Sequence, residues 1–137
     1  MEIPAKDKSS YLKGLLILAK RDNLLSESEE VIIKGIAQRL GFSTDFYEYT
    51  LQNLLQNEYL TEEPVKFSKK ELSYSFIIDG LKLAHSDDNL HDSEINWLRQ
   101  TAEENNISME WFDNKLEEIK KNSFQSPNPE LALYSLI

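Results

Sequence analysis

Apolar residues recur at intervals of three and four along most of the chain, and this spacing predicts amphipathic α-helices. No alternating apolar and polar stretch competes with it, and only four glycines and four prolines interrupt the chain. The predicted helices cover residues 7–23, 27–40, 44–57, 69–86, 92–105 and 109–122. The pattern therefore predicts an all-α fold in which each helix turns an apolar face toward a shared core.

Start and stop signals bracket these helices. Four serines stand where a hydroxyl would accept an unpaired backbone N–H of a first helical turn, namely Ser26, Ser43, Ser68 and Ser108. Ser26 with Glu29 and Ser68 with Glu71 also fit the capping box, in which hydroxyl and carboxylate satisfy such groups reciprocally. Gly41 fits a helix stop, and Pro64 disfavours a helix through the linker at residues 58–68.

The second half of the chain repeats the first at a shift of 65 residues, with ten identities in 43 aligned positions and no gap. We therefore expect residues 1–137 to form a single domain. It would be a compact bundle of six to seven helices built from two pseudo-twofold-related three-helix repeats, residues 11–57 and 69–122. The first and fourth helices carry the widest apolar stretches, so we expect them to be innermost.

The C-terminal stretch follows the second repeat and differs from it. Pro127 and Pro129 precede the apolar sequence ELALYSLI. We expect a short helix at residues 129–136 that docks on the bundle. A free tail that binds a partner is the alternative.

The amino-acid composition of the chain excludes several classes of function. The chain has no cysteine, which excludes disulfides, thiolate zinc sites and thiol redox chemistry. Fifteen basic residues stand against 24 acidic ones, for a net charge of −9, and no basic stripe is present to neutralise nucleic-acid phosphates. We see no secretory signal, and no apolar run approaches the ~20 residues that span a bilayer. These features predict a cytoplasmic protein without membrane insertion or a nucleic-acid partner.

Acidic residues gather where the first two helices of each repeat are joined. Asp22 and Glu29 in the first loop correspond to Asp87 and Glu94 in the second. Their carboxylates are candidate ligands for calcium, magnesium or manganese. The structural alternative is an Asx turn, in which each aspartate accepts backbone N–H groups of its loop. Neither loop matches an EF-hand, because the second has Asp92 where that motif needs glycine.

Both histidines of the chain flank the second acidic loop. His85 and His91, with the carboxylates near them, could offer mixed nitrogen and oxygen ligands to zinc, manganese or iron. A metal-dependent hydrolase using His85 and His91 is one hypothesis, and an exposed pair that binds no metal is the other. The chain has no phosphate-binding glycine loop, no serine elbow and no cysteine nucleophile. We therefore expect a protein that is not an enzyme.

Aromatic residues at equivalent places of the two repeats are expected in the core. These residues are Phe46 with Trp111 and Tyr47 with Phe112, and Trp97 joins them because it replaces an isoleucine of the first repeat. The positions of the tyrosines are less constrained by the sequence, and one or two of Tyr47, Tyr49, Tyr59 and Tyr134 could mark a partner surface instead.

Each repeat has the pattern L-x-L-A-x-x-D-x-x-L-x-x-S-E followed by an amphipathic helix, at residues 16–29 and 81–94. This pattern resembles the TerB-like family of helical domains, named for tellurite-resistance protein B. The resemblance covers residues 11–121 and implies a link to tellurite and other stress responses, to membrane-associated complexes and to chaperone partners. It also implies a divalent-cation site, which has been suspected in some members.

These observations together predict a non-enzymatic binding or scaffold module of a bacterial stress-response type. Its partner would be a protein, and a homodimer or a peripheral membrane complex is compatible with the sequence. The candidate residues for a weak divalent-cation site are Asp22, Glu29, Asp87, His91 and Glu94.

Overall fold

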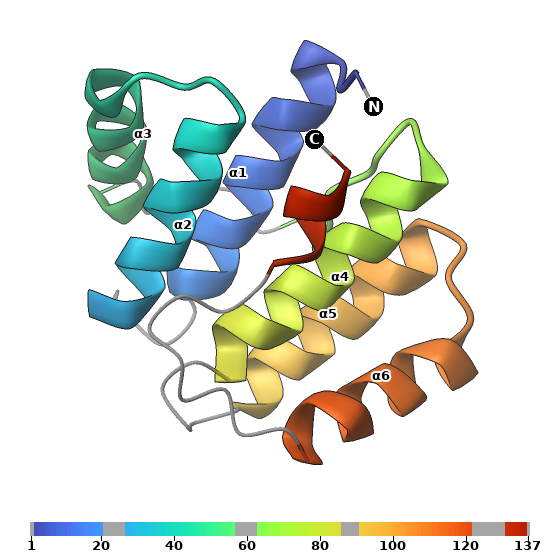
Figure 1. Ribbon diagram of the computed structural model, residues 1–137. Helices are drawn as coiled ribbons and strands as arrows, with labels where there is room; N and C mark the ends of the chain where they lie inside the picture. Colours follow the sequence, from blue (N-terminus) through green and yellow to red (C-terminus); the bar gives the residue numbers. More distant parts are fainter. Residues whose placement is uncertain (1, 21–26, 57–62, 86–90, 122–130, 137) are drawn as a thin grey trace.

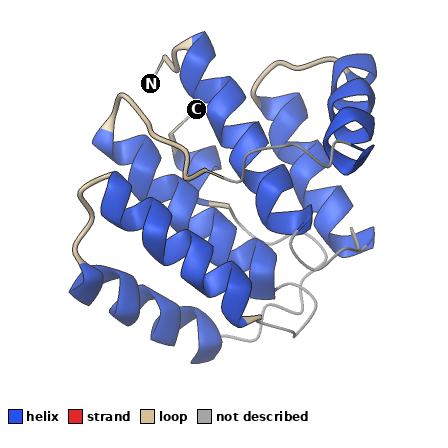
Figure 2. Ribbon diagram, turned by 180° about the vertical axis from the view of Figure 1, so that it is seen from behind, coloured by secondary structure: helices blue, strands red, loops and turns tan. Residues whose placement is uncertain are grey.

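The computed structural model describes residues 2–20, 27–56, 63–85, 91–121 and 131–136. Its α-helices (Figure 1) are α1 Ala5–Lys20, α2 Glu27–Arg39, α3 Thr44–Gln56, α4 Lys70–His85, α5 Asp92–Glu104 and α6 Met109–Lys121. A short 3-10 helix, η1, follows at Ala132–Ser135. Every regular element in these ranges is helical (Figure 2), which confirms the predicted all-α fold.

The helices α1 and α4 pack against each other, and each carries two further helices (Figure 1). α2 and α3 pack on α1, whereas α5 and α6 pack on α4. Residues 14–19 of α1 are all buried, and α4 is similarly covered, so both apolar faces join one core. This arrangement confirms the predicted compact bundle. Within the described ranges, no helix has the length and apolarity needed to cross a bilayer.

Two glycines let the central helices approach their neighbours closely. At Gly14, a Cβ atom would lie 2.5 Å from the ring of Phe76, which is fully buried. At Gly80, a Cβ atom would lie 2.7 Å from the side chain of Leu98 on α5. Because the core is packed on both sides, a larger residue at either position would force its neighbours to move.

The helix bounds keep the shift seen in the sequence: α1 begins at residue 5 and α4 at residue 70, and both later pairs are also 65 residues apart. α2 and α5 end alike, since Gly41 and Asn106 follow them with φ of 94° and 60°. After each, the N–H of Phe42 or Ile107 reaches the carbonyl five residues earlier, as in a Schellman motif. Gly41 is the helix stop that was predicted, and the pseudo-twofold relation of the halves stays a prediction.

Serine hydroxyls cap α3 and α6 as predicted. Ser43 and Ser108 each accept the N–H of the residue three positions later at 3.1 Å. Ser68 acts differently: its hydroxyl and its N–H both donate to the buried Asp7 carboxylate of α1, the N–H at 3.1 Å. Because α4 begins at Lys70, Ser68 lies one residue before the N-cap position, and its bonds tie the linker to α1 in place of the predicted capping box. The capping box predicted at Ser26 lies outside the described residues.

Candidate functional site

The residues predicted to bind a divalent cation are only partly described. Glu29 and Glu94 are buried in the first turns of α2 and α5, and His91 is exposed immediately before α5. Asp22 and Asp87 lie outside the described residues. Among the residues that are described, no group of three histidine, aspartate or glutamate side chains could hold a metal. The buried glutamates sit where a helix dipole stabilises an anion, and the cation site stays a prediction.

The two histidines lie at different helix ends. His85 is the last residue of α4 and is half-buried, whereas His91 and Asp92 at the start of α5 are exposed. No described contact joins the two rings, so the hydrolase hypothesis gains no support from this geometry.

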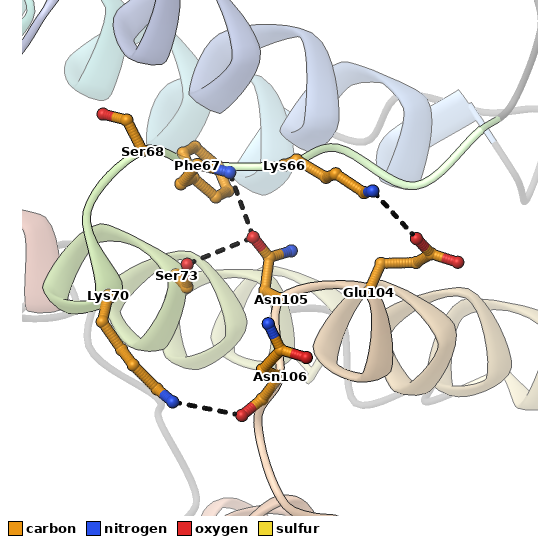
Figure 3. A pocket seen from close by; sticks show the side chains of 8 residues that line it. All are labelled: Lys66, Phe67, Ser68, Lys70, Ser73, Glu104, Asn105 and Asn106. Atoms are coloured by element: carbon orange, nitrogen blue, oxygen red, sulfur yellow. Dashed lines mark hydrogen bonds and ion pairs between the residues drawn. The ribbon is translucent and has the colours of Figure 1, made fainter.

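A polar pocket lies where the linker, the start of α4 and the end of α5 meet (Figure 3). Its volume is about 370 Å³. The residues that line it are Lys66, Phe67, Ser68, Lys70, Ser73, Glu104, Asn105 and Asn106. A pocket of this size would suit a small polar molecule, so the partners of its side chains decide whether it is a binding site.

Asn105 uses all its hydrogen-bonding capacity inside the protein. Its Oδ1 accepts the N–H of Phe67 at 3.0 Å and the hydroxyl of Ser73 at 3.2 Å. Its Nδ2 donates to the carbonyls of Val65 and Thr101, both at 2.8 Å. The side chain thus joins the linker to α4 and α5. The repeat pattern does not indicate this role of Asn105, because the equivalent residue of the first repeat is the apolar Leu40.

The two lysines at the pocket also have partners within the protein (Figure 3). Lys66 pairs with Glu104 at 3.4 Å, and Lys70 donates to the carbonyl of Asn106 at 3.2 Å. Because Lys66 and Glu104 are both exposed, their pair contributes little to stability. The polar groups of the pocket therefore hold the linker in place, and nothing in their arrangement points to a ligand.

A second polar cluster is buried between α1 and α4 around Asp79, whose carboxylate is fully buried. Its Oδ2 accepts the hydroxyl of Tyr11 at 2.5 Å, and Tyr11 Oη lies 2.8 Å from Ser75 Oγ. The backbone N–H groups of Ala132 and Leu133 donate to the two carboxylate oxygens at 2.7 and 3.2 Å. Burial raises the pKa of Asp79 from 3.8 to about 6, although these hydrogen bonds act in the opposite direction.

The C-terminal segment, residues 131–136, docks on the bundle through this cluster. Leu131 and Leu133 are buried, and the guanidinium of Arg39 lies 5.0 Å from the ring centre of Tyr134. A docked helix at residues 129–136 was predicted, and within residues 131–136 the helical part is a 3-10 helix of four residues. A helix this short forms few hydrogen bonds within itself. The N–H groups at its start donate to the Asp79 carboxylate instead.

The helix α3 presents aromatic side chains to solvent. Phe46 is 47% exposed and Tyr49 is 68% exposed, and the Phe42 ring stacks on Phe46 with centroids 5.2 Å apart. The prediction that Phe46 is a core residue is therefore wrong. Its repeat equivalent Trp111 packs on Tyr74 of α4 at 4.7 Å, but the residue of α1 equivalent to Tyr74 is a serine. Phe46 therefore lacks the equivalent of the contact that helps to cover Trp111.

The other predicted core aromatics are buried or partly buried. Trp97, Tyr47 and Phe112 are fully covered, and Trp111 is half-buried. Tyr59 lies outside the described residues, and Tyr134 is partly covered in the C-terminal contact. Tyr49 is thus the described tyrosine that best fits the predicted partner surface.

Acidic side chains accompany the exposed rings of α3. Asp45 and Glu48 are exposed next to Phe46 and Tyr49 in the chain. The helix carries no lysine or arginine between residues 44 and 56. This face therefore combines apolar rings with negative charge, a combination that suits a positively charged, partly apolar ligand.

Tyr47 lies on the opposite side of α3, and its hydroxyl is unpaired within the described part of the chain. Its Oη is buried and has no hydrogen-bond partner among the described residues. Burial, followed by the charges of Glu30 and Glu48, raises the Tyr47 pKa. The unpaired hydroxyl costs stability, since a buried polar group without a partner loses its hydration.

Replacing Tyr47 with phenylalanine is expected to raise the free energy of unfolding by about 1 kcal/mol, because the unpaired hydroxyl is removed. Phe112, the repeat equivalent, provides the matched control. Phe112→Tyr should lower the stability, since it places a hydroxyl in a fully buried site. Urea unfolding followed by circular dichroism measures both changes. A loss of stability in Tyr47→Phe would show that this hydroxyl has a favourable partner.

Comparisons with known proteins add no identification. No protein-family model matches the chain, and neither a curated protein nor a solved structure does. The resemblance to the TerB-like family stays a prediction that depends on the two acidic loop patterns.

Proposed function

We propose that this protein is a non-enzymatic interaction module whose binding surface is the aromatic face of α3, defined by Phe46 and Tyr49 of the helix and Phe42 just before it. The observation that carries the proposal is the exposure of Phe46 and Tyr49 in a bundle whose other large aromatic side chains are mostly packed. Exposed aromatic side chains on one helix face are typical anchors of protein interfaces. A scaffold role in a stress response, as the TerB-like resemblance implies, is compatible with such a surface.

The partner is inferred to be a basic segment that also carries apolar side chains. Asp45 and Glu48 would pair with its lysines or arginines while Phe46 and Tyr49 bury against its apolar side chains. A second copy of this chain is a poorer occupant, because each copy has a net charge of −9 and the helix has no basic residue to offset it.

The helix α6 offers an internal comparison for this proposal. Glu110 and Asp113 occupy the positions of Asp45 and Glu48, but Asp113 pairs with Arg99 at 2.7 Å and α6, unlike α3, also carries lysines. The aromatic pattern does not recur, since Trp111 is packed on α4 and the equivalent of Tyr49 is an asparagine. Since charge and aromatic rings would both favour α3 over α6, the decisive comparison is with a variant that lacks the exposed rings of α3 but keeps Asp45 and Glu48.

A short amphipathic helical peptide made of leucine and lysine is a suitable probe. We expect it to shift the backbone NMR signals of α3 more than those of α6. The double variant Phe46→Ala, Tyr49→Ala should bind it at least about tenfold more weakly, which corresponds to about 1.4 kcal/mol. The same peptide with glutamate in place of lysine should not bind.

Three results would contradict the proposal. Equal shifts on α3 and α6 would indicate non-specific attraction to an acidic surface. Unchanged affinity in the double variant would exclude the aromatic face as the binding surface. If the native protein formed a dimer that the double variant could not form, a second copy would be the occupant instead of a basic partner.

A further inference from the structure

The C-terminal segment, residues 131–136, forms hydrogen bonds within itself. The N–H of Tyr134 donates to the carbonyl of Leu131 at 3.2 Å, and the N–H of Leu136 donates to that of Leu133 at 2.9 Å. These bonds close the short turns of η1, which is red in Figure 1 and packs on α4. The segment therefore brings its own turn to the bundle, in the manner of a bound peptide.

The bundle supplies an acceptor for the first backbone N–H groups of this turn. Asp79 of α4 accepts the N–H of Ala132 at 2.7 Å and that of Leu133 at 3.2 Å. Tyr11 of α1 donates to the same carboxylate, and its Oη lies 2.8 Å from Ser75 Oγ. The acceptor is thus held in place by α1 and α4, outside the segment that it binds. Because every residue except proline carries a backbone N–H, this contact recognises a chain without reading its side chains.

The side chains of the segment occupy sites that select their shape. Leu131 and Leu133 are buried and belong to the hydrophobic core. Tyr134 lies against α2, where a Cβ atom at Gly35 would be 3.1 Å from its hydroxyl oxygen. The guanidinium of Arg39, also on α2, lies 5.0 Å from the centre of the Tyr134 ring, within the range of a cation–π contact. The bound pattern is therefore Leu-x-Leu-Tyr.

We propose that this surface of α2 and α4 is a recognition site for a linear Leu-x-Leu-Tyr segment of a partner protein, with residues 131–136 as the resident competitor. The backbone acceptor, the two leucine sites and the surface beside Gly35 are formed by residues of the bundle. A segment of another protein with the same pattern would form the same contacts. This site is separate from the aromatic face of α3, so the two proposals can fail independently.

Competition with the protein's own segment sets the affinity that a partner needs. A tethered segment acts at an effective concentration on the order of 1 mM. A second copy of this chain offers only the contacts that the tethered segment already makes, so it is a poor occupant at lower concentrations. A partner segment can add contacts beyond those of residues 131–136, and it is therefore the favoured occupant.

A peptide with the sequence of residues 129–137 is the probe, and the full chain with Leu131→Ser and Leu133→Ser is the receptor whose own segment is weakened. The peptide should bind this double variant at least about tenfold more tightly than the native chain, because a site that is filled for about 90% of the time loses that factor in affinity. NMR shifts of α4 amides measure both affinities. A control peptide with serine at both leucine positions should not bind. A second control with proline in place of Ala132 should bind more weakly, because it lacks the N–H that donates to Asp79 Oδ1.

Gly35→Ala, made in the same double variant, tests whether the peptide lies in the proposed orientation. The added Cβ would crowd the tyrosine hydroxyl at 3.1 Å, so it should weaken binding of the tyrosine peptide. A peptide with phenylalanine in that position has no hydroxyl and should bind with and without Gly35→Ala equally. A general loss of structure would weaken both peptides alike, and alanine favours a helix more than glycine does.

A measurement on the native chain covers the case in which the double variant does not fold. Peptide at several millimolar should displace residues 131–136, so the amide signals of Ala132 and Leu133 should move while the peptide replaces their contacts on α4. Equal affinity for the native chain and the double variant, or no displacement from the native chain, would overturn the proposal. A native dimer at micromolar concentration that the double variant fails to form would overturn it as well, because a second copy would then be the occupant.

Discussion

Replacing Asn105 with leucine is expected to lower the free energy of unfolding by roughly 3 kcal/mol, one of the largest single-residue effects we predict. Leucine occupies the equivalent position of the first repeat, so its shape and helical propensity are suitable. Leucine cannot form the two hydrogen bonds between the Asn105 side chain and the linker. In one of them Asn105 accepts the N–H of Phe67, and in the other it donates to the carbonyl of Val65. Both groups lie in a partly buried region and would lose their partner. Urea unfolding measures the loss.

Asn106 supplies the control for this prediction. Asn106 has φ of 60°, and its repeat equivalent Gly41 has φ of 94°, so glycine suits this backbone conformation. Asn106→Gly should therefore change the stability by no more than about 0.5 kcal/mol. If Asn105→Leu were as well tolerated as Asn106→Gly, the bonds to the linker would not contribute to the fold. The polar groups that line the pocket beside Asn105 would then have a role other than holding the linker.

The stability difference between the native protein and Asp79→Asn is expected to change by about 2 kcal/mol between pH 4 and pH 7. The folded-state pKa of Asp79 is raised from 3.8 to about 6, so the folded state binds the proton more tightly than the unfolded state. Proton binding at Asp79 therefore stabilises the native protein at low pH. This stabilisation is lost as the pH rises from about 4 to about 6, and the loss is complete above pH 6 to 7. Relative to the native protein, Asp79→Asn gains stability with rising pH.

Unfolding curves in urea at four pH values across this window test the sign as well as the size of the effect. Comparing two proteins at each pH cancels the contribution of all other titrating groups, provided the substitution leaves them undisturbed. If the stability difference between the two proteins did not change with pH, Asp79 would have the same pKa in the folded and unfolded states. A difference of the opposite sign would mean that its hydrogen bonds outweigh its burial.

The helices and most of their ends could be predicted because they depend on neighbouring residues. The start of every helix from α1 to α6 lies within two residues of its predicted position. The caps at Ser43 and Ser108 and the stop at Gly41 use contacts across three to five residues. Such short-range bonds recur wherever the local sequence recurs, which is also why the two repeats have helices of equal length.

The candidate functional residues were less predictable. Phe46 fits an apolar helix face, but its exposure depends on whether a neighbouring helix supplies a side chain to cover it. The acidic residues were predicted as a site because they recur in both repeats, whereas Asp79 and Asn105 do not recur. Their equivalents are Gly14 and Leu40, so the comparison of repeats pointed away from the residues that hold the structure together.

The amino-acid order alone established an all-helical bundle, the places where its helices begin and the absence of cysteine chemistry, since periodicity and capping act over a few residues. Only the three-dimensional packing decided which polar groups are buried and which aromatic rings remain exposed. The bonds from Tyr11 to Asp79, from Ser68 to Asp7 and from Asn105 to Val65 join residues 68, 61 and 40 positions apart. Contacts of that range exist only after the helices have packed, because no local pattern specifies the group that will lie opposite.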